Sequence, residues 1–143
     1  MNKKGFTLVE LILVITLMAV ISVLVIPNIL DALNSSKQQK YESLYKLVEK
    51  NMKLYNDKYS ADLWNNGKTS FDFCEGDTQG CSSGINKLKE SGSDLTLDDC
   101  IIDTMTITKN DTKYEYNLRM TCGTEDKVQC NRDKKEIKCV NKK

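Results

Sequence analysis

A single acidic side chain lies in the most apolar stretch of the chain, and its charge calls for a chemical role. The stretch from Phe6 to Ile26 is apolar at 17 of its 21 positions, and Glu10 is its only charged residue. A carboxylate at the depth of a membrane interior costs roughly 2.5–3.5 kcal/mol, so such groups usually have a partner and a function. The sequence therefore predicts a specific partner for Glu10.

The chain's other reactive side chains are six cysteines, all in its C-terminal half. They are Cys74, Cys81, Cys100, Cys122, Cys130 and Cys139. An even number of cysteines in an oxidising compartment indicates disulfides. Zinc is the alternative, but the sequence has no histidine and no C-x2-C or C-x4-C spacing. We therefore predict disulfides, with no metal and no cofactor.

Two common signals of a catalytic site are missing from the sequence. The absence of histidine removes the usual general base and both familiar triad types. No glycine-rich phosphate loop is present either. We predict no catalytic residue and expect that the protein is not an enzyme.

The apolar stretch is long enough to be a membrane anchor. A helix of that length rises about 31 Å, which is the thickness of a bilayer's hydrocarbon core. Lys3 and Lys4 precede it, and the positive-inside rule keeps that end in the cytoplasm. We expect a single pass of the cytoplasmic membrane with everything after Pro27 outside, where cysteines are oxidised.

The residues around the start of the apolar stretch match a known signal. The sequence KKGFTLVEL at 3–11 resembles the type IV prepilin family, which includes the pseudopilins of type II secretion and competence systems. The resemblance implies that a membrane-embedded prepilin peptidase cuts between Gly5 and Phe6 and methylates the new amine on Phe6. It also implies a membrane assembly machinery that polymerises the subunits into a filament.

Cleavage after Gly5 would supply a cation for Glu10. The new amine on Phe6 has a reference pKa of about 7.7–8.0 and is positive at neutral pH. Glu10 can satisfy the N-terminus of its own helix, where the dipole is positive. It can equally reach the Phe6 amine of the next molecule, which the resemblance favours as an assembly contact. The residues alone leave both possibilities open.

The elements that must position these groups begin with one long helix. Apolar residues continue at helical spacing beyond Pro27, where a kink is expected, and a helix over residues 6–59 would be about 80 Å long. Its second half is amphipathic, with an expected core-facing stripe of Leu30, Leu33, Tyr41, Leu44, Val48, Met52, Tyr55 and Tyr59. The expected divisions are a leader (1–5), a transmembrane and assembly half (6–27), an amphipathic half (28–59) and a head (60–143).

The head is expected to be a small antiparallel β-sheet, so the fold class is α+β. We expect a long irregular connection over 60–100 with a short helix at 85–90, followed by strands over 101–109 and 113–122. A two-residue turn at Asn110-Asp111 would place Ile107 opposite Tyr114.

The expected disulfides join neighbouring cysteines along the chain. In the register just given, Cys100 is one residue out of step with Cys122, a difference that a bulge would remove. A last hairpin would pair Cys130 with Cys139, and Cys74 and Cys81 would form a local bridge.

Charge is uneven along the head. Residues 60–126 carry six basic and thirteen acidic side chains, whereas residues 127–143 carry seven basic and two acidic ones. Capture of DNA by the basic tail is one interpretation, weakened because Arg132 is its only arginine and no aromatic residue lies between its lysines. A solvated surface, or contact with the acidic face of a neighbouring subunit, is favoured.

These features together predict a structural subunit of a type IV pilus-like filament that presents a surface, for adhesion among other roles. One alternative is a pseudopilin of a type II secretion or competence system. A second, of a different class, is a singly anchored monomeric extracytoplasmic binding protein. The expected location is the cytoplasmic membrane first and an extracellular filament afterwards.

Overall fold

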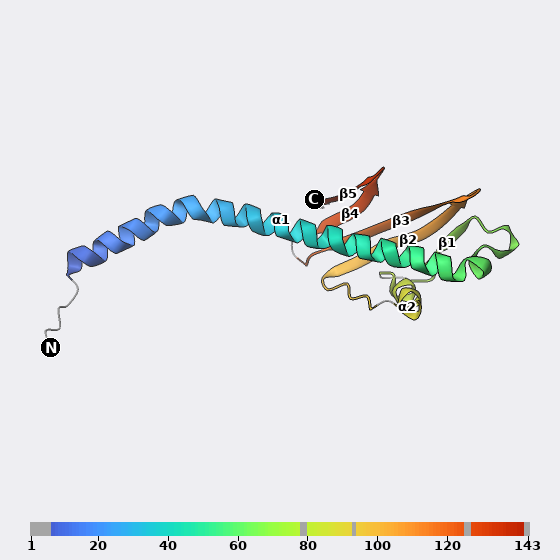
Figure 1. Ribbon diagram of the computed structural model, residues 1–143. Coiled ribbons are helices and arrows are strands. Elements are labelled where there is room, and N and C mark those ends of the chain that lie inside the picture. The colour runs from blue at the N-terminus through green and yellow to red at the C-terminus, as the bar shows by residue number, and fades with distance from the viewer. Residues whose placement is uncertain (1–6, 78–79, 93, 125–126, 142–143) are drawn as a thin grey trace. The chain divides into compact units, whose positions relative to one another are not determined.

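A computed structural model of the chain describes residues 7–77, 80–92, 94–124 and 127–141, without the side chains of residues 23–28 and 30 (Figure 1). The chain divides into two compact units, Met1–Gln38 and Gln39–Lys143. The first unit holds the N-terminal part of one long helix. The second holds the rest of that helix and all of the strands.

The long helix α1 runs over Leu8–Leu63. Its sequence contains no glycine and only one proline, Pro27, so little interrupts helix propagation. The end expected at Tyr59 falls four residues short, but Tyr59 does have a non-helical backbone (φ −113°, ψ 15°). The regular helix is therefore disturbed near the position that the sequence indicated.

Among the residues that the structure describes, no helix combines the length and the apolar character needed to cross a bilayer. The expected transmembrane half, residues 6–27, includes residue 6, which is not described, and residues 23–27, whose side chains are not described.

The second unit contains an antiparallel sheet whose strands follow one another in chain order. The strands are β1 (Ser70–Asp72), β2 (Cys100–Asn110), β3 (Lys113–Cys122), β4 (Val128–Asp133) and β5 (Glu136–Asn141). Each strand pairs with the next one along the chain. The expected fold class, an N-terminal helix with a disulfide-linked antiparallel sheet, is confirmed at this level.

The β2–β3 hairpin differs in register from the expected one. Asn110 pairs with Lys113, so the turn is Asp111-Thr112, one residue later than expected. Asp111 adopts the left-handed conformation that this turn requires (φ 53°). Because moving a turn by one residue moves the register by two, Ile107 lies opposite Tyr116 and not Tyr114. Ile107 and Met105 are buried on the side of the sheet that the sequence indicated. Ile101 was expected on the same side, opposite Met120, but it is exposed, and Ile102 pairs with Met120 instead.

A bulge between Ile102 and Thr104 corrects the alignment at the other end of the hairpin. It brings Cys100 opposite Cys122, and these residues form a disulfide. The other two disulfides are Cys74–Cys81 and Cys130–Cys139. They are the three pairs named from the sequence.

The connection expected to be irregular is more ordered than the turn formers suggested. It contains a 3₁₀ turn (Asn65–Gly67), the short strand β1 and the helix α2 (Ser82–Glu90). The helix expected at 85–90 is confirmed and begins three residues earlier. Strand β1 was missed because only three residues of it pair, with Phe71 opposite Ile107.

The core of the second unit lies between α1 and the sheet. Its fully buried members from α1 are Tyr45, Val48 and Met52, with Tyr41 nearly buried. They pack with residues of β2 and β3 such as Met105. The expected stripe contained Tyr41, Val48 and Met52 but missed Tyr45.

Candidate functional site

The N-terminus of α1 is built around Thr7 and Glu10. The Thr7 backbone N–H donates to Glu10 Oε2 at 2.9 Å, and the Thr7 hydroxyl donates to the same oxygen at 2.8 Å. In return the Glu10 backbone N–H donates to the Thr7 hydroxyl oxygen at 3.3 Å. This reciprocal pattern is a capping box, in which a side chain at the N-cap and one three residues later satisfy each other's backbone donors.

The capping box supplies the partner that the lone acid required, inside its own chain. It also places the carboxylate at the helix end where the dipole is positive. Both donors from Thr7 use Oε2, and in the described part of the chain Oε1 of Glu10 accepts no hydrogen bond. A carboxylate can accept about four hydrogen bonds. Glu10 therefore caps its own helix and still has an oxygen available for another cation.

The other polar side chains of the apolar stretch also bond within the helix. The Thr16 hydroxyl donates to the carbonyls of Ile12 and Leu13, at 3.0 and 2.9 Å. The Ser22 hydroxyl donates to the carbonyl of Met18 at 2.7 Å. Bonds of this type remove the cost of placing a hydroxyl in an apolar medium. The polar groups thus do not conflict with burial of this segment.

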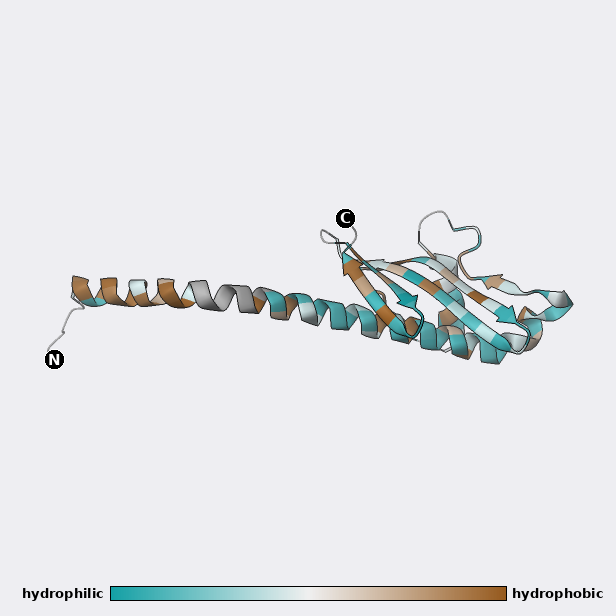
Figure 2. Cartoon of the chain, turned by 90° about the horizontal axis from the view of Figure 1, so that it is seen from above, coloured by the Kyte–Doolittle hydropathy of each residue, from teal (hydrophilic) through white to brown (hydrophobic). Residues whose placement is uncertain are grey.

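The first part of α1 presents large apolar side chains on all sides. Figure 2, which is coloured by residue hydropathy, shows that this part of the helix is mostly hydrophobic. Between residues 8 and 21 the exposed ones include Leu8, Leu11, Leu13, Ile15, Leu17, Met18 and Ile21, each more than half exposed. An apolar surface of this extent is found where a lipid or protein partner covers it. Leu33, expected in the core-facing stripe, is also half exposed.

Three of the residues named from the sequence are not tested by this geometry. Gly5 and Phe6 lie outside the described residues, and cleavage between them stays a prediction, as does methylation of Phe6. Pro27 lies within α1, but its side chain is not described, so the expected kink also stays a prediction.

A second cluster of polar residues, in the second unit, was not found from the sequence. The Glu49 carboxylate of α1 is buried between Arg132 of β4 and Lys53, whose Nζ lies 3.1 Å from Glu49 Oε1. Burial raises the pKa of Glu49. The hydrogen bonds and charges of Arg132 and Lys53 outweigh burial and hold the pKa below its ordinary value of 4.5. The i, i+4 spacing of Glu49 and Lys53 was the available signal.

Tyr45 lies one helical turn before Glu49 and contacts the sheet through its hydroxyl. It is fully buried and donates a hydrogen bond to the Leu118 carbonyl of β3 at 2.8 Å. Burial, and then the negative charge of Glu49, raises the pKa of Tyr45 above its ordinary value of 10.0. The hydroxyl therefore remains a neutral donor near pH 7. The β4–β5 hairpin is thus joined to α1 through Arg132, and β3 through Tyr45.

In the described part of the chain, no group of three or more histidine, cysteine, aspartate or glutamate residues is placed to hold a metal ion. The six cysteines are all used in disulfides. The arrangement consists of an apolar, self-capped helix start and a disulfide-linked α+β unit. It has the features of an anchored or assembled subunit.

The comparison with family models agrees with this class of protein. Residues 1–26 match the family model described as the prokaryotic N-terminal methylation motif. This motif is the N-terminal signal of type IV pilins and pseudopilins, and the chain carries it. No curated protein and no solved structure matches the chain.

Proposed function

We propose that this protein is a structural subunit of a type IV pilus-like filament. In this proposal, a prepilin peptidase removes residues 1–5 and methylates Phe6. The cytoplasmic membrane holds the subunit through residues 6–27 before assembly, and the assembly machinery then transfers it into an extracellular polymer. The observation that carries the proposal is the methylation motif over residues 1–26, in which Gly5, Phe6 and Glu10 have their expected spacing.

The apolar surface of the first helical part supports a transfer from lipid to protein. Burial of apolar area contributes about 25 cal/mol per Å², whether the covering medium is lipid or other helices. Residues 17–26 contain no glycine, so the closest backbone contacts, which glycine allows, are not expected there. The copies would pack mainly through the large side chains of this segment.

Glu10 would have two roles in the proposed filament. Its Oε2 atom caps the helix that carries it, through Thr7. Its Oε1 atom would accept the methylated Phe6 amine of a neighbouring subunit. A cation and a carboxylate in an apolar medium are each costly alone and favourable when paired at close range. The intrachain and interchain partners of Glu10 are therefore compatible.

The test compares Glu10→Gln with wild type in cells that carry the complete assembly system. Glutamine at this position keeps the capping geometry, because its amide oxygen still accepts from Thr7, but it removes the charge. We expect normal removal of residues 1–5 and at least a tenfold loss of sheared filaments. Asp31→Asn makes the same type of change at an exposed position of α1 and should leave the filament yield unchanged.

Intact-mass analysis of the sheared filaments provides the second measurement. The mature subunit should lack residues 1–5 and carry one added methyl group. Filaments that form normally from subunits retaining residues 1–5 would contradict the proposal. A cleaved protein that stays monomeric in every condition would favour the membrane-anchored binding protein instead.

A further inference from the structure

The pairing between β3 and β4 stops halfway along β3. The last pair is Arg119 with Asn131, and residues 113–118 of β3 pair with β2 only. In an antiparallel sheet, alternate residues bond to each neighbouring strand. About half of the amide groups in residues 113–118 therefore point away from β2. In the described part of the chain no other strand pairs with them.

Tyr45 separates the two strands at the point where pairing stops. If the ladder continued, Leu118 would pair with Arg132. The Leu118 carbonyl instead accepts a hydrogen bond from the Tyr45 hydroxyl, and the backbone of Arg132 interacts with the same hydroxyl. The phenol thus lies between the two backbones, where the next pair would form.

The side chain of Arg132 holds β4 away from β3 beyond that point. Its guanidinium forms the ion pair with buried Glu49, and Nη1 donates to the Lys135 carbonyl at 3.1 Å. Its Nε atom is buried and has no hydrogen-bond partner within the described residues. The ion pair directs the β4–β5 hairpin towards α1, and one buried donor is left for a ligand.

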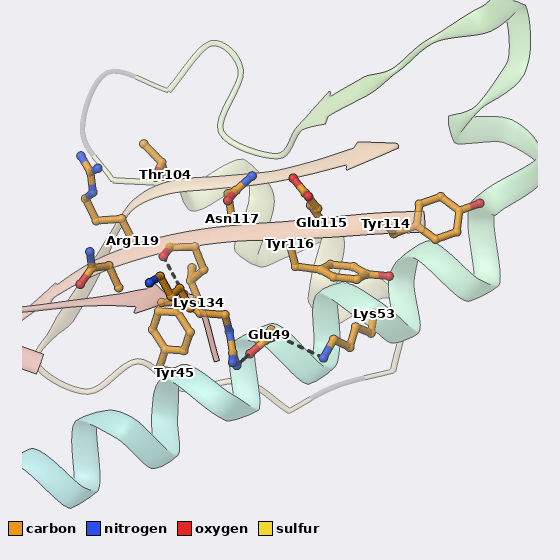
Figure 3. A pocket seen from close by; sticks show the side chains of 13 residues that line it. Tyr45, Glu49, Lys53, Thr104, Tyr114, Glu115, Tyr116, Asn117, Arg119 and Lys134 are labelled. Atoms are coloured by element: carbon orange, nitrogen blue, oxygen red, sulfur yellow. Dashed lines mark hydrogen bonds and ion pairs between the residues drawn. The ribbon is translucent and has the colours of Figure 1, made fainter. Parts of the chain in front are cut away.

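The separation produces a cleft of about 570 Å³ between the open edge of β3, α1 and the end of β4 (Figure 3). Figure 3 shows Tyr116 on the side of β3 that faces α1, and Asn117 and Arg119 projecting from the other side. Four of the lining residues are cationic: Lys53, Arg119, Arg132 and Lys134. Two are acidic, and one of these, Glu49, already pairs with two of the cations.

We propose that this cleft is a peptide-binding site, in which an acidic, extended segment of another protein adds a strand to the open edge of β3. Unpaired backbone groups provide the main-chain contacts of strand addition, and neighbouring side chains select the sequence. The excess of cations favours acidic side chains on the added strand. Every residue involved lies in the second unit, so this role does not use the N-terminal segment that carries the proposed assembly contact.

The chain's own exposed strands fit this edge poorly. Strand β1 has only three residues, which is too few to cover residues 113–118. Strand β5 has one acidic and one basic residue, Glu136 and Lys138, so it carries no net negative charge. It also lies in the segment 127–143, where seven basic side chains outnumber two acidic ones. Like charges opposite one another destabilise a strand pair. A second copy of this chain is therefore a poorer partner than an acidic segment of a different protein.

The experiment titrates the full processed chain, in detergent micelles, with a blocked nine-residue peptide that alternates glutamate with valine or threonine. Amide hydrogen exchange should slow in residues 113–118 when the peptide binds. A peptide of the same sequence, N-methylated at alternate backbone positions, should bind at least tenfold more weakly because it lacks the ladder donors. A version with lysine in place of glutamate should also bind more weakly.

A matched pair of variants tests the charge preference. Lys134→Glu reverses a charge that lines the cleft and should weaken peptide binding about fivefold. Lys135→Glu makes the same change one residue further on, outside the cleft lining, and should have little effect. The proposal is wrong if no peptide binds at millimolar concentration, or if the N-methylated peptide binds equally well. Protection of residues 113–118 through self-association, without added peptide, would also overturn it.

Discussion

At the scale of single residues, the N-terminal groups and the residues of the head differ in how far they could be predicted. Gly5, Phe6 and Glu10 lie within six consecutive positions, so their pattern can be read directly from the sequence. Tyr45 contacts Leu118, which is 73 residues away, and Glu49 contacts Arg132, which is 83 residues away. Such contacts depend on the final register of the sheet, and no local pattern contains that information.

Gly84 in α2 occupies a position with no room for a side chain. A Cβ atom there would lie 2.5 Å from Cys81 Sγ and from Met105 Cε, and 2.8 Å from Phe73 Cβ. These distances are shorter than any normal contact, and all three neighbours are fully buried core residues. The absence of a side chain thus lets α2 approach β2 and the Cys74–Cys81 disulfide closely.

Gly84→Ala should therefore lower the free energy of unfolding by about 1–3 kcal/mol, the usual cost of overpacking a core. Denaturant titration of the processed chain, followed by tyrosine and tryptophan fluorescence, measures this change. Asn86→Ala is the control, because Asn86 is exposed in the same helix and alanine favours helix formation. Equal stability of the two variants would mean that α2 can move away from the sheet at little cost.

At the scale of elements, the long helix and the two main strands were predictable because their patterns are long and periodic. The turn of the β2–β3 hairpin was misplaced by one residue, since Asn110-Asp111 and Asp111-Thr112 are both acceptable turn sequences. Strand β1 is too short to show an alternating pattern. A bulge was one way to align Cys100 with Cys122, and the structure has a bulge between Ile102 and Thr104.

The ion pair between Glu49 and Arg132 joins α1 to the β4–β5 hairpin and should make stability depend on pH. Because the pKa of Glu49 is lower in the folded state than its ordinary value of 4.5, its contribution is present above that value. It is lost as the pH falls through the folded-state pKa. Glu49→Gln should reduce stability at pH 7 and show a smaller further loss between pH 5 and pH 3. Denaturant titrations at these pH values provide the measurement.

Glu42→Gln is a suitable control for this measurement, because Glu42 lies on the same helix and forms no ion pair within the described residues. The free energy of unfolding of the Glu42→Gln variant should depend on pH as it does in wild type. If the Glu49→Gln variant shows the same pH dependence, the ion pair does not contribute measurably to folding.

The three disulfides should stabilise the folded state by different amounts, because they close loops of different length. Cys100 and Cys122 are separated by 22 positions, and Cys74 and Cys81 by 7. From loop entropy alone, removing the longer bridge costs about 3 kcal/mol and removing the shorter one about 2 kcal/mol. The paired change Cys100→Ala with Cys122→Ala should thus destabilise the chain more than Cys74→Ala with Cys81→Ala. Thermal unfolding of both variants measures the order, and the reverse order would contradict this ranking.

At the scale of the whole molecule, the sequence indicates two parts with different environments: an apolar N-terminal segment and a disulfide-linked unit. The structure separates the chain into two compact units at Gln38–Gln39. The sequence indicates a change of composition at Pro27, where the apolar stretch ends, and no change of composition marks Gln38–Gln39. The arrangement that copies adopt in a filament depends on contacts between molecules, which one chain's sequence does not specify.

A lysine placed in the apolar part of α1 tests whether this part has a different environment from the second unit. Ile15→Lys should reduce retention in the membrane and filament yield, since lysine at the centre of a membrane helix costs roughly 2.5–3.5 kcal/mol. Carbonate extraction of membranes and shearing of filaments give the two measurements. Leu47→Lys introduces the same charge at an exposed leucine in the second unit and should leave both quantities unchanged. Equal behaviour of the two variants would contradict a special environment for the first helical part.

The connectivity of the disulfides has a consequence for biogenesis. The bridges join the first cysteine to the second, the third to the fourth and the fifth to the sixth, so no bridge encloses or crosses another. A thiol oxidase that joins cysteines in the order in which they emerge during export would produce the native set directly. We therefore expect maturation to proceed at a normal rate in cells that lack a disulfide isomerase, provided that an oxidase is present.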